Sequence, residues 1–405
     1  MKLNYFSIEE SLVKIILFLL CLSSFLQVAG VVFDFGLRYT TNILILTFLF
    51  SIFLIVFYIK KTKYYVNVNF IFTIALLFYL IFILILQGIF YPVLYDSSGR
   101  SALEYVKSYT LGGLLWLTIG YSLGLFKINV FDNKYIPFLI FSLLLLVLSF
   151  TDKIGFVVDY ALLKTARSDD IDYSHLVIGH FVVILLLFSL ALNKSIKLIY
   201  SILALVILFI VGGRSDLLVF IATLFIYKYL FEKKDVLYII LAIIPFLILS
   251  LLFFNLSFLK ETKFYFLISG EQDGSLELRE IIFRKTIENL YSQFLIGNPN
   301  KIITTDFGAP ELYNNVGAYA HNIFSAWQFY GFLFFLVIIF YIFITTREVL
   351  NISFRGRGEG LDVILKFFIL LFIFSTISLL ITKSIIYYPL WLSMGYWLNK
   401  IKFKF

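Results

Sequence analysis

The sequence predicts an all-α polytopic integral membrane protein with about twelve transmembrane helices. Hydrophobic residues make up 61% of the chain and charged residues only 14%, whereas a soluble domain is about a quarter charged. Apolar runs of roughly 17–25 residues, the length that crosses a bilayer, recur along the whole chain. Basic residues gather at alternate ends of these runs, as they do where they mark cytoplasmic loops.

The predicted helices follow one another closely. The first apolar run is too long for a signal-peptide core and lacks a small-residue cleavage pattern, so we count it as a helix. The seventh and eighth runs are separated only by "GGRS", and the last run is short. We expect helices near residues 12–33, 41–59, 70–91, 109–126, 135–150, 174–192, 198–213, 216–231, 236–256, 321–345, 363–382 and 384–399.

The basic residues also orient the helices. With the N-terminus inside, the short inner loops and the tail hold Lys60, Lys61, Lys63, Lys127, Lys134, Lys194, Lys197, Lys228, Lys233, Lys234, Arg347, Arg355, Arg357, Lys400, Lys402 and Lys404. The outer loops hold most of the Asp and Glu residues. We therefore expect both termini to be cytoplasmic. The same placement explains the net charge of +8 without a nucleic-acid partner.

One outer loop, residues 257–320, is far longer than a connection needs, and loops of such length are usually functional or disordered. Its stretch "SLELREIIFRKTIENLYSQFLIG" predicts an amphipathic helix on the membrane surface. The apolar positions of this helix are Leu278, Ile281, Ile282, Leu290, Phe294 and Leu295. Since no repeat or soluble second domain is visible, we expect one transmembrane domain over residues 1–405 with this loop as its elaborated subregion.

Arg214 ends an apolar run on the outer side, where positive charge is otherwise disfavoured. Gly212 and Gly213 allow a tight turn before it, and Ser215 or Asp216 is expected to cap the next helix. One interpretation is an arginine that reaches lipid headgroups while its stem lies along apolar surface. The other is a guanidinium that binds the phosphate oxygens of a ligand.

Two further arginines lie on the amphipathic helix of the outer loop. Arg284 has Glu280 and Glu288 four residues away on either side, so an ion-paired solvated face explains it adequately. Arg279 has no acid three or four residues away in either direction. It is therefore the stronger candidate for binding an anion, with surface decoration as the alternative.

His321 stands where the polar outer loop leads into a long apolar run, and Asn322 follows it. An ionisable group at a membrane boundary is a functional hypothesis by default, and an imidazole accepts a proton near neutral pH. His175 and His180 are five residues apart, which is not a facing spacing on a helix. We treat those two histidines as packing or interface residues.

Metal and cofactor sites are not predicted. Asp169, Asp170 and Asp172 are compatible with a divalent cation that binds a sugar diphosphate, but such carboxylates are more often solvated charge. Asp34 is a weaker candidate base. Cys21, the single cysteine, forms no intramolecular disulfide or metal cluster. Walker, Rossmann and zinc-protease patterns are absent from the sequence, which argues against cytosolic nucleotide hydrolysis.

Three stretches in order resemble one family. They are "VGGRSDLL", then "LELREIIFRKTIENLYSQFLIGNP", then "YAHNIFSAWQFYGFLFFLVIIFYIF" with its glycine at Gly331. This order, spacing and sidedness is similar to that of the superfamily of O-antigen polymerases (Wzy type) and O-antigen ligases. The resemblance covers residues 200–345, while the earlier part of the chain matches only as a helical array. The outer-loop insert "NKIITTDFGAPELYNNV" departs from the pattern.

The resemblance implies a glycosyltransferase fold of the GT-C type in the bacterial inner membrane, acting in lipopolysaccharide biosynthesis. An undecaprenyl-pyrophosphate-linked glycan donor would meet a second such glycan, or lipid A core in a ligase, at the outer face. Arg214 and Arg279, with Arg284 as a weaker helper, would hold the donor pyrophosphate. His321 would act as general base or positioning group, and Asn322 would orient it or the acceptor. No cofactor or metal is implied, and a flippase and a chain-length regulator are possible partners.

Three rival interpretations remain open beside the polymerase. An O-antigen ligase shares the same motifs. A lipid-linked oligosaccharide flippase also often has about twelve helices, but it should show broken helices and ionisable groups near mid-membrane. A glycosyltransferase that uses a polyprenyl-phosphate sugar would depend on Asp34 or on the "SDDID" acids.

Overall fold

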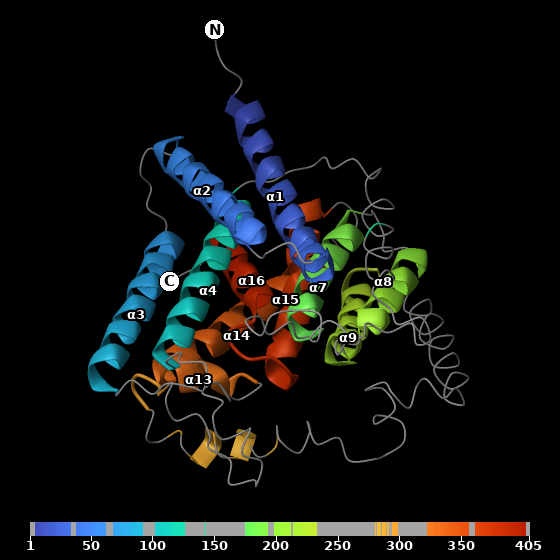
Figure 1. Cartoon of the computed structure of the whole chain (residues 1–405). Coiled ribbons are helices and arrows are strands. Elements are labelled where there is room, and N and C mark those ends of the chain that lie inside the picture. The colour runs from blue at the N-terminus through green and yellow to red at the C-terminus, as the bar shows by residue number, and fades with distance from the viewer. Residues whose placement is uncertain are drawn as a thin grey trace, which may run out of the picture. The chain divides into compact units, whose positions relative to one another are not determined.

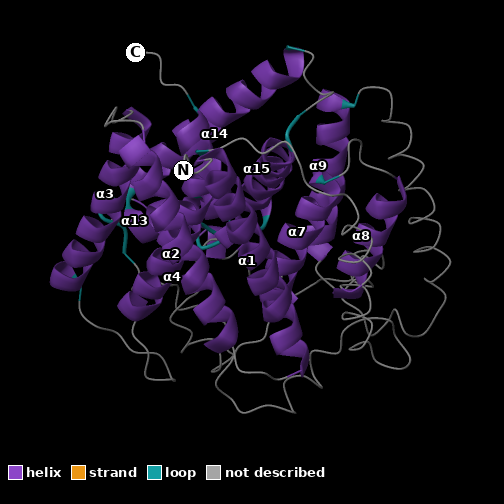
Figure 2. Ribbon diagram, turned by 90° about the horizontal axis from the view of Figure 1, so that it is seen from above, coloured by secondary structure: helices purple, strands orange, loops and turns teal. Residues whose placement is uncertain are grey.

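We describe the protein from a computed structural model. The structure describes residues 5–33, 38–61, 68–91, 102–125, 142, 175–192, 198–211, 214–232, 280, 282–284, 286–288, 290, 294–298, 322–355 and 361–401. Within these ranges all regular secondary structure is helical, as Figure 2 shows. The helices are α1 (Tyr5–Phe33), α2 (Arg38–Lys61), α3 (Val68–Phe90), α4 (Ala102–Gly124), α7 (His175–Ala191), α8 (Leu198–Val211), α9 (Arg214–Phe231), α13 (Phe324–Tyr330), α14 (Phe332–Phe354), α15 (Val363–Ile381) and α16 (Tyr388–Lys400).

Several of these helices are long and apolar enough to cross a membrane. Among the described residues there are 5 such spans: Ile8–Ala29, Thr40–Lys61, Val68–Phe90, Phe332–Phe354 and Val363–Ile381. Gly179–Ala191 and Ile199–Ile210 are shorter apolar helices. The protein is therefore a membrane-embedded helical protein, as the composition predicts.

The described helices overlap the predicted ones, although α4 begins at Ala102 rather than at 109 and α16 at Tyr388 rather than at 384. One predicted helix is divided. The predicted helices at 135–150 and 236–256 fall outside the described residues, apart from helical residue 142. The divided helix is the one expected over 321–345, which breaks at Gly331 into α13 and α14. That prediction was wrong because Gly331 has a φ of 83°, which ends one helix before the next begins.

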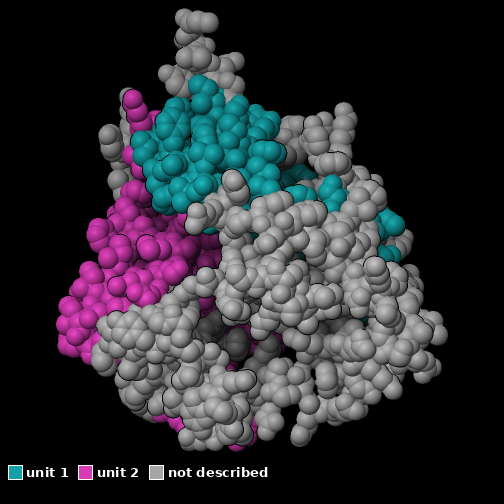
Figure 3. All heavy atoms as spheres, in the orientation of Figure 1, with its two compact units in different colours: residues 1–57, 122–271, 349–374 teal, residues 58–121, 272–348, 375–405 magenta. Residues whose placement is uncertain are grey.

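The chain divides into two compact units, which are coloured separately in Figure 3. The first unit comprises residues 1–57, 122–271 and 349–374, and the second comprises residues 58–121, 272–348 and 375–405. The sequence-based prediction of one transmembrane domain stays a prediction.

The first unit is built around α7. α1 lies along α7, α7 contacts α8 and α9, and α8 contacts α9 (Figure 1). Residues 181–192 are all buried, as expected for a helix that is apolar all round and packed at the centre. The rings of Phe188 on α7 and Phe367 on α15 meet edge to face, with centroids 5.5 Å apart.

The start of α9 differs slightly from the predicted cap. The helix begins at Arg214, so Ser215 and Asp216 lie within its first turn rather than at the N-cap position. The fully buried Asp216 carboxylate packs against Gly179 of α7. A carboxylate in the first turn also interacts favourably with the helix dipole.

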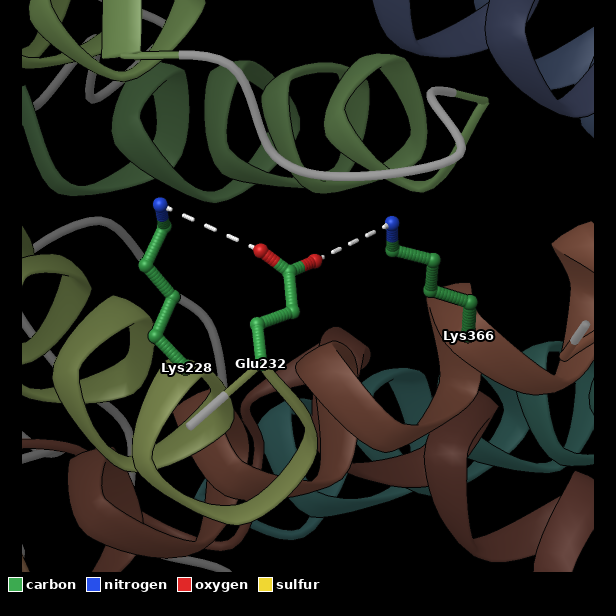
Figure 4. A network of polar contacts seen from close by, with 3 residues as sticks. All are labelled: Lys228, Glu232 and Lys366. Carbon is green, nitrogen blue, oxygen red and sulfur yellow. Dashed lines mark ion pairs between the residues drawn. The ribbon is translucent and has the colours of Figure 1, made fainter. Parts of the chain in front are cut away.

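Three ionised side chains join α9 to α15 inside the first unit. The carboxylate of Glu232 lies between two ammonium groups, 3.9 Å from Lys228 Nζ and 3.7 Å from Lys366 Nζ (Figure 4). Both lysines are almost fully buried, and Lys366 Nζ lies 5.6 Å from the ring centroid of Tyr227. The end of α9 and the beginning of α15 thus come together. The charge pattern of the sequence assigns both ends to the cytoplasmic face.

The second unit brings α3 and α4 against α16. A Cβ at Gly120 of α4 would collide with the carbonyl oxygen of Leu392 on α16, so only glycine permits this close approach. Asn69 of α3 donates from Nδ2 to the backbone oxygens of Asn399, at 3.1 Å, and of Ile401. These bonds fix the end of α16 beside the start of α3.

Candidate functional site

Asn322 fixes the start of α13. Its side-chain Oδ1 accepts a hydrogen bond from the Phe324 backbone N–H at 3.0 Å. Its backbone oxygen accepts bonds from the Ser325 backbone N–H at 3.1 Å and from the Ser325 hydroxyl at 2.7 Å. Asparagine commonly bonds the backbone two residues on in this way. The Asn322 side chain therefore already has a structural role at the start of this helix. Its predicted role, to orient His321 or the acceptor, would come in addition to that structural role.

The outer-loop segment 280–290 lies against this start. The structure describes residues 280, 282–284 and 286–288 of it as helical, and Ile282, Thr286 and Leu290 are buried at a spacing of four residues. The ring centroids of Phe283 and Phe324 are 5.8 Å apart. The predicted amphipathic helix is thus confirmed at Ile282 and Leu290, and its Phe283 contacts the residue two positions after Asn322.

The apolar face does not continue to the end of the predicted helix. Phe294 and Leu295, which we expected on that face, are 45% and 67% exposed. The prediction was wrong because residues 294–296 form a turn and the helical period no longer applies to them. Leu278 and Ile281 of the predicted face lie outside the described residues.

The turn after this segment pairs with the break between α13 and α14. The Phe332 N–H donates to Phe294 O at 2.8 Å, and the Asn298 N–H donates to Gln328 O at 2.9 Å. A Cβ at Gly331 would collide with Leu295 O, so the two backbones approach as closely as glycine allows. The break is therefore a specific junction between two segments that are distant in sequence.

Two side chains of the α3 end satisfy the carbonyl groups at this junction. Gln87 Nε2 donates to Ile296 O at 2.7 Å and to Phe329 O at 2.6 Å, and the side chain is buried. The Tyr91 hydroxyl donates to Gly297 O at 2.7 Å. Burial raises the pKa of Tyr91, so this hydroxyl stays protonated as a donor. Backbone carbonyl groups that are buried away from water require such partners.

The connection between α15 and α16 also reaches the start of α13. The Ile385 N–H donates to the Ser325 hydroxyl oxygen at 2.7 Å, while that hydroxyl donates to Asn322 O. Three segments that are far apart in sequence therefore meet at one helix start in the second unit: the outer-loop segment, residues 322–325, and the α15–α16 connection.

The predicted cations are distributed as follows. Arg284 forms an ion pair with Glu280 at 2.6 Å, with both side chains well exposed, which confirms the expected solvated pair. Arg214 is the first residue of α9, in the first unit. Arg279 and His321 lie outside the described residues. The segment that carries Arg284 thus lies beside the start of α13 in the second unit. The catalytic and binding roles assigned to all five candidate residues stay predictions.

The predicted acids and histidines add no metal site within the described part of the chain. No group of three His, Cys, Asp or Glu residues capable of holding a metal ion occurs there. Asp34, Asp169, Asp170 and Asp172 lie outside it. His180 is half-buried on α7, and His175 is the first residue of that helix.

Sequence reasoning missed Gln87, Ser325 and Lys383. Gln87 is an amide within an otherwise apolar run, and Lys383 is a cation at the end of another, so both carry a signal of polarity out of place. Ser325 gives no such signal because a serine early in a helix is ordinary.

Comparison with family models, with curated proteins and with solved structures finds no match to this chain.

Proposed function

We propose that the protein is a polysaccharide polymerase of the O-antigen type in the bacterial inner membrane. It joins undecaprenyl-pyrophosphate-linked oligosaccharide repeat units at the outer face of that membrane, on a GT-C-type scaffold. The observation that carries the proposal is the contact between Phe283 and Phe324. It brings the arginine-bearing outer-loop segment to the helix start that follows His321 and Asn322, as a joint site requires.

The residue types at this site suit the reaction. An acceptor hydroxyl attacks the anomeric carbon of the donor glycan, the bond from that carbon to the pyrophosphate oxygen breaks, and the lipid pyrophosphate leaves. Guanidinium groups of Arg279 and Arg284 stabilise the charge that builds on the leaving phosphate oxygens. His321 takes the proton from the acceptor hydroxyl, as a general base near neutral pH can. Donor and acceptor are both lipid-linked glycans.

The test is a gel of surface polysaccharide from a strain that lacks the gene, complemented with variants. We expect the null strain to show lipid A core with a single repeat unit and the wild-type gene to restore the ladder. His321→Ala and Arg279→Ala should both fail to restore the ladder. For His321→Ala, which removes the general base, we expect at least about a hundredfold less polymer than for the wild type. Arg347→Ala is the matched control, because Arg347 is an exposed arginine of α14 in the same unit, at the end assigned to the cytoplasm. It should restore the full ladder.

Two other outcomes would replace this proposal. Bare core with lipid-linked polymer accumulating would make the protein a ligase. A flippase is the second candidate, because the junction at Gly331 is a broken helix of the kind transporters use. Single lipid-linked units trapped on the cytoplasmic side would identify it.

A further inference from the structure

The connection between α15 and α16 holds a lysine in a protected position. Lys383 is 5% exposed, and its neighbours Ser384 and Ile385 are also buried. Its Nζ lies 5.8 Å from the ring centroid of Tyr387, close enough for a cation–π interaction. A lysine is rarely buried to this extent, since its ammonium group loses hydration.

This connection is fixed to the helix start at Asn322 by a short chain of hydrogen bonds. The Ile385 N–H donates to the Ser325 hydroxyl oxygen, whose proton goes to Asn322 O. On the other side of the same residue, Ile385 O accepts a bond of 2.7 Å from Trp391 Nε1. Lys383 is two residues before this doubly held residue, so its backbone belongs to the same tied connection. Asn322 itself is only half-buried, so the start of α13 is partly accessible from outside the protein.

The charge pattern adds a second reason to single out this lysine. Cations gather at the ends of helices assigned to the cytoplasm, whereas Lys383 follows α15 at the end assigned to the outer face. A structural role is available to it, because a cation beyond the last turn of a helix interacts with the helix dipole. That role does not require a position beside residues 322–325, where the outer-loop segment also lies.

We infer that Lys383 is a further binding residue of the proposed site and that its ammonium group holds a phosphate of the lipid-linked donor. The identity of the lipid rests on the proposed function. The shared chemistry is a phosphate anion attached to a lipid, which both a prenyl pyrophosphate and an ordinary anionic headgroup present. A buried ammonium group binds such an anion as a point charge with three donors.

The experiment measures lipid binding by the full-length protein in phosphatidylcholine nanodiscs, with undecaprenyl pyrophosphate as the probe and native mass spectrometry as the readout. We expect Lys383→Met, which keeps the apolar stem and removes the charge, to weaken binding by about tenfold to a hundredfold. Lys383→Arg should bind within about threefold of wild type, since it keeps the charge. Lys107→Met is the matched control, because Lys107 is an exposed lysine of α4 in the same unit, at the end also assigned to the outer face.

The thermal midpoint of each variant separates binding from folding. If Lys383→Met does not purify as a single species, Lys383→Gln replaces it under the same criterion. Wild-type affinity in a charge-removing variant, with or without a lowered midpoint, would make the lysine structural and overturn the inference. Equal competition by phosphatidylglycerol would assign it to bulk headgroups and also overturn it.

The outcome is distinguishable from that of the polymerase proposal. If the null strain keeps its polysaccharide ladder but Lys383→Met loses the prenyl pyrophosphate, the lysine inference stands and the polymerase fails. If the ladder requires the gene but Lys383→Met binds the lipid like wild type, only the lysine inference fails.

Discussion

Gly331 determines where the long apolar segment of the second unit breaks. Its φ of 83° belongs to a region that side chains other than glycine rarely adopt, and an added Cβ would collide with Leu295 O. We expect Gly331→Ala to destabilise the protein by about 1–3 kcal/mol from backbone strain, and by more if the segments cannot separate. Thermal unfolding of the purified protein in detergent, followed by tryptophan fluorescence, measures this as a lowered midpoint.

Gly88→Ala is the control for that substitution. Gly88 lies inside α3, and a Cβ there would lie 3.5 Å from Leu103 Cδ2, which is an ordinary contact. Alanine is favoured over glycine within a helix by roughly 0.5–1 kcal/mol, so this variant should be at least as stable as the wild type. Equal midpoints for Gly331→Ala and the wild type would show that the junction is not held as described.

The residues of the junction show what a sequence read alone leaves out. The glycine at 331 is visible, but a single glycine in an apolar run is often tolerated within a helix. What breaks the helix is a backbone segment thirty-odd positions earlier, at Phe294 and Leu295, together with the amide of Gln87. Contacts between residues so far apart in sequence leave no local pattern. The position of Gly331 in the apolar run could therefore be read from the sequence, but the break in the helix could not.

The joint between α9 and α15 depends on one carboxylate. Glu232 lies between the buried ammonium groups of Lys228 and Lys366. Glu232→Gln removes the negative charge and leaves both buried lysines without an ionic partner at this position. We therefore expect the free energy of unfolding to fall by about 3 kcal/mol. Adding Lys366→Met should recover part of that loss, because one uncompensated charge is removed. Thermal unfolding in detergent measures both variants.

An exposed pair with the same spacing provides the control. Glu10 and Lys14 on α1 form an ion pair of 2.7 Å with both side chains nearly half exposed. Exposed pairs contribute only about 0–1 kcal/mol, so Glu10→Gln should leave the midpoint almost unchanged. If Glu10→Gln and Glu232→Gln lowered the thermal midpoint by similar amounts, burial of the Lys228–Glu232–Lys366 group would not contribute to stability as we expect.

Helices were the part of the fold that hydropathy predicted well. The described helices fall where apolar runs were expected, because a bilayer forces each span to bond its own backbone and to expose apolar side chains. The outer-loop helix was harder. Its buried positions Ile282 and Leu290 follow from periodicity, but the turn at 294–296 does not, since it depends on pairing with α14.

The orientation of the whole molecule is testable by chemical labelling. In a Cys21→Ser background we expect Glu280→Cys to react with a membrane-impermeant maleimide in intact spheroplasts, because Glu280 is an exposed residue of the outer loop. Lys60→Cys should react only after the membrane is permeabilised, since Lys60, also exposed, lies at an end assigned to the cytoplasm.

The unmodified Cys21→Ser protein is the blank for this measurement. The opposite labelling pattern would invert the topology and move the segment beside Asn322 to the cytoplasmic face. An enzyme for lipid-linked glycans at the outer face would then be excluded, whatever the local geometry. The candidate site was therefore predictable only as a set of motifs. The contact between the outer-loop segment and the start of α13 needed the fold, and the sidedness of the motifs rests on charge bias.

The anchors at Asn298 and Asn322 allow the chain between them to vary. The Asn298 N–H donates to Gln328 O, six positions beyond Asn322, so both anchors lie at the same short helix, α13. Closing a longer loop between fixed ends costs only about 0.6 kcal/mol for each doubling of its length. Changes in length between residues 298 and 322 should therefore cost little stability, because neither anchor depends on the number of residues between them.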